Sequence, residues 1–95
     1  MRFEWDENKN QSNQRKHGVS FSKASEVFND PHHLISIEGD YEGEERWQTL
    51  GMTSGFAILV VVNVFRENDG GETIRIISAR RAQPQERAFY ARENG

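Results

Sequence analysis

The segment IRIISARRA, residues 74–82, contains the side chains best suited to bind an anion. Its apolar run ends in two adjacent arginines, Arg80 and Arg81. A guanidinium can donate two parallel hydrogen bonds to a phosphate or a carboxylate. Because side chains alternate along a strand, we expect the two arginines to leave opposite faces, with Ile76 and Ser78 on the face of Arg80. Residue type alone slightly favours ordinary surface charge over an anion site.

A second group of candidate residues lies in GEERW, residues 43–47. Glu45, Arg46 and Trp47 could act as a base, a phosphate clamp and a stacking platform for a nucleobase. Composition favours the alternative, an exposed ion pair beside a core tryptophan. Arg66, at the end of the longest apolar run, would bind substrate only if it reaches an open face of the sheet.

A third group, RKHG at residues 15–18, places Lys16 and His17 at the end of a predicted helix. Histidine can exchange a proton near neutral pH, and lysine can bind phosphate. Alternatively, His17 only complements the helix dipole. His32 and His33 are adjacent and have no spaced ligand partner, so we predict neither a metal site nor a cofactor.

Composition restricts the class of protein. The 95 residues predict one domain over 1–95, and the absence of cysteine excludes disulfides and zinc–thiolate sites. The first ten residues contain no apolar signal region and the longest apolar run is too short for a bilayer, so we expect a cytoplasmic protein without a membrane partner. The net charge of −3 alone argues against nucleic-acid binding, but arginine outnumbers lysine nine to three.

The predicted elements form an α+β fold. Asp6 and Gly18 cap a first helix that contains no apolar residue, and a second helix begins near Ser20 and stops before Pro31. We predict four strands, at residues 34–38, 46–52, 56–65 and 73–79. A short last helix is predicted to begin at Pro84. Ile35 and Ile37 are expected to be the buried side of the first strand, and residues 39–45 an acidic loop. Short turns then imply a four-stranded antiparallel meander with helices on one face.

The order of these blocks resembles the BrnT family, the toxins of BrnT/BrnA type II toxin–antitoxin systems. The resemblance is carried by residues 3–30, by GEERWQTLG, by LVVVNV and by IRIISARRAQPQERAFY, which together cover nearly the whole chain. It implies a RelE-like fold and an RNA-cleaving toxin that arrests growth. It also implies a BrnA-like antitoxin, a ribbon-helix-helix DNA-binding partner that represses the operon with the toxin attached. The complex would be a heterotetramer with a toxin dimer, and operator DNA would be bound only through the antitoxin.

For the site, the resemblance implies metal-free transesterification of RNA. The expected catalytic residues are Arg80 for transition-state stabilisation, Glu45 or His17 for proton transfer, and Arg46 as a phosphate contact. The residues expected to bind substrate are Arg81, Lys16, Arg66, Trp47 and Tyr90, the last of which could orient an arginine. Members of the family often carry histidine or a threonine-containing pair where this chain has Asn63 and Val64, which could reduce activity.

Two other functions stay open from the sequence. The chain could be a corepressor that has lost catalysis and holds its antitoxin through the acidic segment 38–45. It could also be a small α+β domain with an unrelated ligand.

Overall fold

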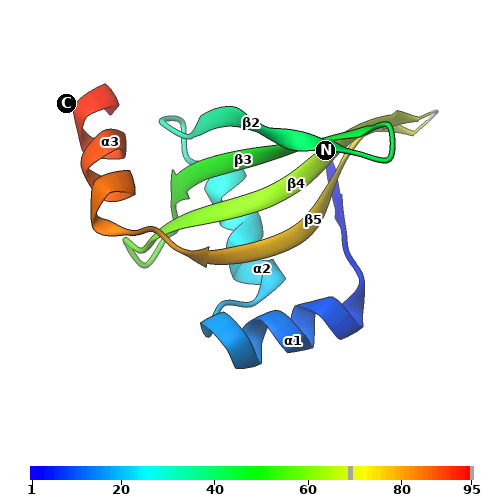
Figure 1. Cartoon of the computed structure of the whole chain (residues 1–95), viewed down its shortest axis with the longest axis horizontal. Helices are drawn as coiled ribbons and strands as arrows, with labels where there is room; N and C mark the ends of the chain where they lie inside the picture. The colour runs from blue at the N-terminus through cyan, green and yellow to red at the C-terminus, as the bar shows by residue number, and fades with distance from the viewer. Residues whose placement is uncertain (69, 95) are drawn as a thin grey trace.

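The computed structural model describes residues 1–68 and 70–94 as an α+β fold with three α-helices and a five-stranded mixed sheet. The strand order is β1-β5-β4-β3-β2, and only the pairing of β1 with β5 is parallel. The elements, shown in Figure 1, are β1 (Arg2–Glu4), α1 (Glu7–His17), α2 (Phe21–Ala24), the 3-10 helix η1 (Ser25–Asn29), β2 (Leu34–Tyr41), β3 (Glu44–Met52), β4 (Ile58–Asn68), β5 (Gly71–Arg81) and α3 (Pro84–Asn94). The predicted α+β class is confirmed.

The predicted four-stranded meander is wrong in one respect, because a fifth strand lies at its edge. β1 pairs with β5 in parallel, with Phe3 opposite Ile74. The meander itself, β2 to β5, is antiparallel as predicted. β1 has only three residues, too few for a period-2 pattern to be visible in the sequence.

The predicted acidic loop at residues 39–45 is also wrong, since most of it continues the hairpin of β2 and β3. The turn is reduced to Glu42 and Gly43, which have φ angles of 55° and 82°. Positive φ at both turn residues matches the right-handed twist of the flanking strands. The four acidic residues of this segment, Asp40, Glu42, Glu44 and Glu45, therefore lie on a β-hairpin rather than in an irregular loop.

Ile35 and Ile37 are not the buried side of β2, as the alternation predicted. They are 46% and 64% exposed. β2 is the edge strand, and the core under α2 and η1 is built from β4 and β5 instead, where Phe21, Ala24 and Val27 pack on the strands with Leu59, Val61, Ile76 and Ala79. The edge strand consequently presents an apolar surface.

The polar helix α1 is attached to the sheet by buried amides. Its predicted caps are confirmed, because Asp6 accepts from the Asn8 backbone and Gly18 adopts φ 70°. Asn13 is 7% exposed, and its side chain bonds the backbone of Ala79 in both directions, with Nδ2···O 2.8 Å and N···Oδ1 3.1 Å. Asn13 Nδ2 also donates to the Val19 carbonyl at 2.9 Å. The helix needs no apolar stripe because these bonds fix it beside β5 (Figure 1).

A β-bulge sets which side chains of β5 share a face. Val62 pairs with Ser78 but Asn63 pairs with Ile76, so Ile77 is the extra residue. Ile76 consequently faces the helices with Arg81, and the prediction that it shares the face of Arg80 is wrong. The predicted separation of Arg80 and Arg81 is confirmed, because they pair with Val60 and Leu59, which belong to different core clusters.

We predict that Asn13→Ala destabilises the fold by about 2–4 kcal/mol, because it leaves the buried N–H and carbonyl of Ala79 without partners. The measurement is urea unfolding followed by circular dichroism. Asn8→Ala is the matched control, since Asn8 is exposed on the same helix and should change the free energy of unfolding by less than about 0.5 kcal/mol. Equal stability of the two variants would show that Asn13 does not hold α1.

Candidate functional site

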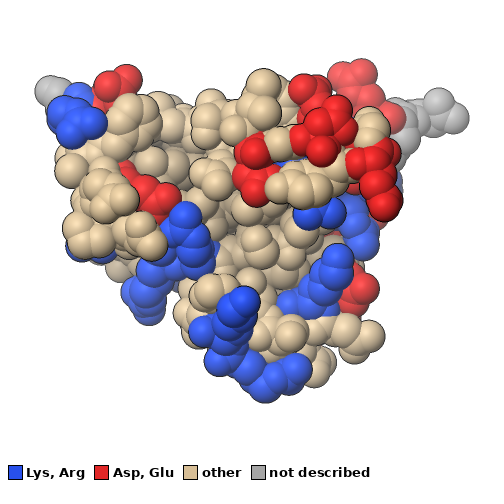
Figure 2. Space-filling view, in the orientation of Figure 1, with Lys and Arg blue, Asp and Glu red and all other residues tan. Residues whose placement is uncertain are grey.

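Acidic side chains gather at one end of the molecule, and many of the basic ones lie along another edge (Figure 2). Figure 2 shows Lys and Arg gathered along the lower edge, where α1 and β5 lie in Figure 1, and Asp and Glu at the upper right. The acidic end is the β2–β3 hairpin, with Glu38, Asp40, Glu42, Glu44 and Glu45. An anionic ligand is therefore attracted to the α1 end despite the net charge of −3.

At the basic end, α1 and β5 enclose an open hollow of about 190 Å³, which we call the α1–β5 ledge. Lys9, Lys16 and His17 line it from α1, and Ser78 lines it from β5. Lys9 and Lys16 are seven residues apart and so share one helix face. β1 pairs only with residues 73–75 of β5, which leaves the following edge of β5 free for α1. Of the predicted residues, Lys16 and His17 line this ledge, and Arg80 is not among the residues that line it.

Arg80 lies two residues beyond Ser78 and is held by a carboxylate. Its Nη1 and Nη2 donate to the two carboxylate oxygens of Glu86 at 2.8 and 2.9 Å. Glu86 Oε1 also accepts from the Gln83 backbone at 2.8 Å, at the start of α3. The hydrogen bonds between them raise the pKa of Arg80 and lower the pKa of Glu86.

The Glu86 pair leaves part of the Arg80 guanidinium unused. Of its five N–H groups, three serve Glu86 and the Arg81 carbonyl, to which Nη1 donates at 3.3 Å. The Nε–H and one Nη2–H have no partner within residues 1–68 and 70–94, and they lie side by side on one edge of the planar group. This edge is a fork that can hold two oxygens of one phosphate.

The remaining arginines of the open sheet face are separate from the ledge. Arg66 binds Glu4 and Glu44 at 3.2 and 2.9 Å, and the Glu44 hydrogen bond raises its pKa. The Arg46 guanidinium lies 4.5 Å from the Tyr41 ring centroid. Arg80 pairs with Val60 of β4, and Val60 pairs in turn with Leu50 of β3. Because Leu50 is four residues from Arg46, strand geometry puts the Cα atoms of Arg80 and Arg46 about 16 Å apart.

Glu45 and Trp47 also lie away from the ledge. Trp47 is half-buried on the helix side, paired with Asn63 and 6.1 Å from the Phe65 ring. Glu45 is exposed on the hairpin opposite Asp40. The structure therefore does not bring GEERW and SARRA together around one point.

Asn63 is fully buried between the sheet and the helices. Its Oδ1 accepts from Thr49 Oγ1 at 2.9 Å, and its Nδ2 has no partner. Because none of its surface is exposed, its side chain cannot touch a ligand on either face. Its effect on any reaction would have to be indirect.

Tyr90 attaches α3 to the sheet rather than facing the ledge. Its hydroxyl donates to Asp30 Oδ2 at 2.5 Å, and the side chain is buried. Burial and this hydrogen bond raise the pKa of Tyr90 to about 12. Burial opposes ionisation of Asp30, but hydrogen bonds from Tyr90 and from the Met52 and His32 backbones lower its pKa overall.

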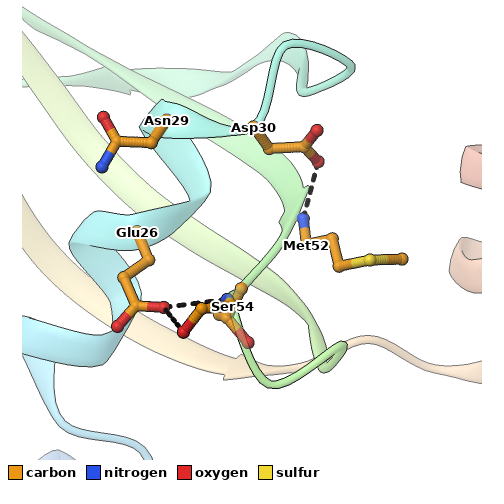
Figure 3. Close-up of a pocket in the computed structure, with 6 residues that line it drawn as sticks. Glu26, Asn29, Asp30, Met52 and Ser54 are labelled. Carbon is orange, nitrogen blue, oxygen red and sulfur yellow. Dashed lines mark hydrogen bonds between the residues drawn. The ribbon is translucent and has the colours of Figure 1, made fainter.

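Asp30 also lines a hollow of about 460 Å³, together with Glu26, Asn29 and Ser54 (Figure 3). Both acids already accept hydrogen bonds there, Asp30 from Met52 and Glu26 from Ser54 (Figure 3). These bonds tie η1 and the loop after it to the end of β3. The hollow is acidic, so it does not suit an anion.

Sequence reasoning missed Lys9, Asn13, Ser78 and Glu86. The seven-residue spacing of Lys9 and Lys16 was a usable signal, as was Glu86 two residues after Pro84. The positions of Asn13 and Ser78 depend on contacts over 65 residues along the chain or more.

Within residues 1–68 and 70–94, His, Asp and Glu form no group of three that could hold a metal ion. No helix of the described chain has the length and apolar character to cross a membrane.

Comparisons with known proteins give one consistent result. Residues 5–86 match the model of a family described as the ribonuclease toxin BrnT of type II toxin–antitoxin systems. The chain is also similar to the 1.1 Å crystal structure of the Brucella abortus ribonuclease toxin BrnT, with 26% identity and a TM-score of 0.60. That similarity covers 87% of this chain and 97% of the other. A comparison with curated proteins finds no match.

We predict that Asp30→Asn loosens α3 and weakens the dependence of stability on acid. Because the folded pKa of Asp30 is depressed, its contribution is complete above its ordinary value of 3.8 and is lost as pH falls through the lower folded value. The variant should lose about 1–2 kcal/mol at neutral pH and show a shallower loss of stability below about pH 4. Thermal unfolding from pH 2 to 7 measures both, with the exposed Glu93→Gln as control. An unchanged acid limb would contradict this role.

Proposed function

The chain belongs to the BrnT family of ribonuclease toxins of type II toxin–antitoxin systems, and on that premise we propose that it is a metal-independent endoribonuclease that inhibits translation. The observation that carries this proposal is the α1–β5 ledge, where Lys9, Lys16 and His17 lie beside Ser78, two residues from Arg80. A proton-transfer group and several cations then meet at an open surface. RNA is the polyanion that such a surface suits.

The proposed reaction is transesterification within the RNA strand. The 2′-hydroxyl loses its proton and attacks the adjacent phosphorus, and the bond from phosphorus to the 5′-oxygen breaks. The 5′-oxygen takes up a proton, which leaves a 2′,3′-cyclic phosphate and a free 5′-hydroxyl. Such a reaction needs a proton acceptor, a proton donor and cations around the phosphorane, all of which side chains can supply.

In this proposal His17 is the proton-transfer group, and Lys9 and Lys16 bind the RNA strand. Arg80 stabilises the phosphorane through its free Nε–H and Nη2–H edge, with Glu86 fixing the orientation of the guanidinium. Glu45, the other proton-transfer candidate, lies on the distant hairpin, so His17 is the better choice. Arg46, Arg66 and Trp47 would contact only a longer RNA that crosses the sheet.

We predict that Arg80→Ala lowers kcat about a hundredfold, since it removes a donor to the developing charge.

Wild-type protein should cleave RNA in EDTA, and His17→Gln should lose about 10²–10⁴ in rate. Gel assays with 3′-end analysis measure cleavage and the cyclic phosphate. Circular dichroism confirms folding, and Arg75→Ala, another arginine of β5, is the matched control. Wild-type protein that leaves RNA intact would contradict the proposed ribonuclease function.

A type II toxin has a cognate antitoxin, and we propose a BrnA-like ribbon-helix-helix protein that carries the toxin to operator DNA. A groove of about 420 Å³ between β2 and α3 is lined by apolar side chains, among them Leu34, Leu50 and Phe89. The same edge strand exposes Ile37 on its other face, opposite Trp47, and leads into the acidic hairpin. An apolar segment with basic flanking residues fits this surface, and the antitoxin is the partner we assign to it.

We predict that Ile37→Asp weakens binding of the cognate antitoxin about thirtyfold or more, as expected when an apolar anchor is replaced by a charge. Isothermal titration with the purified antitoxin measures the Kd. Phe56→Asp is the matched control, because Phe56 is 81% exposed in the turn between β3 and β4 and is not among the residues that line the groove. Unchanged affinity of Ile37→Asp would remove β2 from the interface. Tight antitoxin binding by a wild-type chain without ribonuclease activity would favour the corepressor function instead.

A further inference from the structure

A second hollow, of about 310 Å³, lies on the other side of the C-terminal end of α1. Gln14 lines it from α1, Gly18, Ser20 and Lys23 from the segment that follows, and Arg81 from β5. We propose that this Arg81 hollow binds a phosphate of single-stranded RNA next to the phosphate that is cleaved at the ledge. The inference rests on the proposed function, and it names how the substrate strand crosses the protein.

The first observation is the free charge of Arg81. Among the sheet arginines whose contacts are described, Arg66, Arg75 and Arg80 are paired with carboxylates, and Arg46 stacks on Tyr41. Within residues 1–68 and 70–94, the exposed Arg81 guanidinium has no ion pair or hydrogen bond. An unneutralised guanidinium beside a concave surface is available for a bidentate phosphate contact.

The second observation is the chemistry of the opposite wall. Lys23 Nζ lies 3.3 Å from Ser54 Oγ and 3.4 Å from Glu26, which orients the ammonium and offsets part of its charge. Ser20 Oγ accepts from the Lys23 backbone at 3.0 Å, so its hydroxyl hydrogen is free to donate. The residues that line the hollow include no Asp or Glu. The wall therefore adds donors to Arg81, and the Glu26 carboxylate that is paired with Lys23 lies outside the lining.

The third observation is that the two hollows share a boundary. His17 lines the ledge and the next residue, Gly18, lines the Arg81 hollow. On β5, Ser78 and Arg81 are three residues apart, which is about 10 Å along a strand. A single strand that passes over the end of α1 can place nearby phosphates in both hollows. A ledge phosphate is then the reacting one, and the Arg81 phosphate is held without reacting.

The test is RNA binding that does not depend on cleavage. The probe is a fluorescent 2′-O-methyl octanucleotide, which lacks the attacking hydroxyl, and anisotropy is measured at several salt concentrations. Arg81→Ala should weaken binding about tenfold and reduce the salt slope by about 0.7, the loss of one single-strand phosphate contact. Arg92→Ala, an exposed arginine of α3 with the same change in charge, is the control and should alter neither.

The outcomes separate this inference from the proposed function. Equal binding by Arg81→Ala and Arg92→Ala overturns the Arg81 subsite, even if the wild-type protein cleaves RNA. A loss of binding confined to Arg81→Ala supports the subsite, even if the wild-type protein fails to cleave. With a cleavable RNA, Arg81→Ala should raise KM more than it lowers kcat, because Arg81 holds a phosphate that does not react. A loss confined to kcat would place Arg81 in the reaction and overturn the subsite.

Discussion

The hydrogen bonds between the Asn13 side chain and the Ala79 backbone are the interaction on which the basic end of the molecule depends. An amide side chain offers one donor and one acceptor side by side, as a neighbouring strand would, so it satisfies an otherwise open edge of β5. α1 has no apolar residue with which to pack. Because a buried N–H or carbonyl without a partner is costly, these bonds fix the helix more specifically than an apolar stripe would. The position of Lys9, Lys16 and His17 follows from that contact.

Ion pairing decides which of the many arginines remain available to an anion. Glu4 and Glu44 neutralise Arg66, and Glu4 also approaches Arg75, so the middle of the open face carries little free charge. Glu86 differs because it has two tasks at once: it accepts from the Gln83 backbone at the start of α3 and orients Arg80. The net charge of −3 is therefore a poor guide to the surface that a ligand meets.

The sequence predicted the types of residues at the site better than their grouping. The caps Asp6 and Gly18 and the hairpin order follow from local rules, and the order of the blocks identified the family. The grouping depends on features that act across the chain. The bulge at Ile77 changes which residues of β5 share a face. Nothing in the local sequence distinguishes Asn13 from other polar helix residues. Its role depends on a hydrogen-bond partner 66 positions away. β1 is too short to show a hydrophobic pattern. Ile35 and Ile37 have the alternating pattern of a strand, but no other layer of the fold covers them.

The two proposed ligands bind to different surfaces, and one carboxylate connects these surfaces. Glu86 lines the apolar groove beside β2 and also holds the Arg80 guanidinium. An antitoxin segment in that groove would compete for Glu86 or bury it, and either change alters the orientation of Arg80. Neutralisation would then not require the antitoxin to cover His17 or Lys16. Under these proposals an apolar, acidic surface faces the antitoxin and a basic edge faces RNA, and the Arg80–Glu86 pair lies where the two surfaces meet.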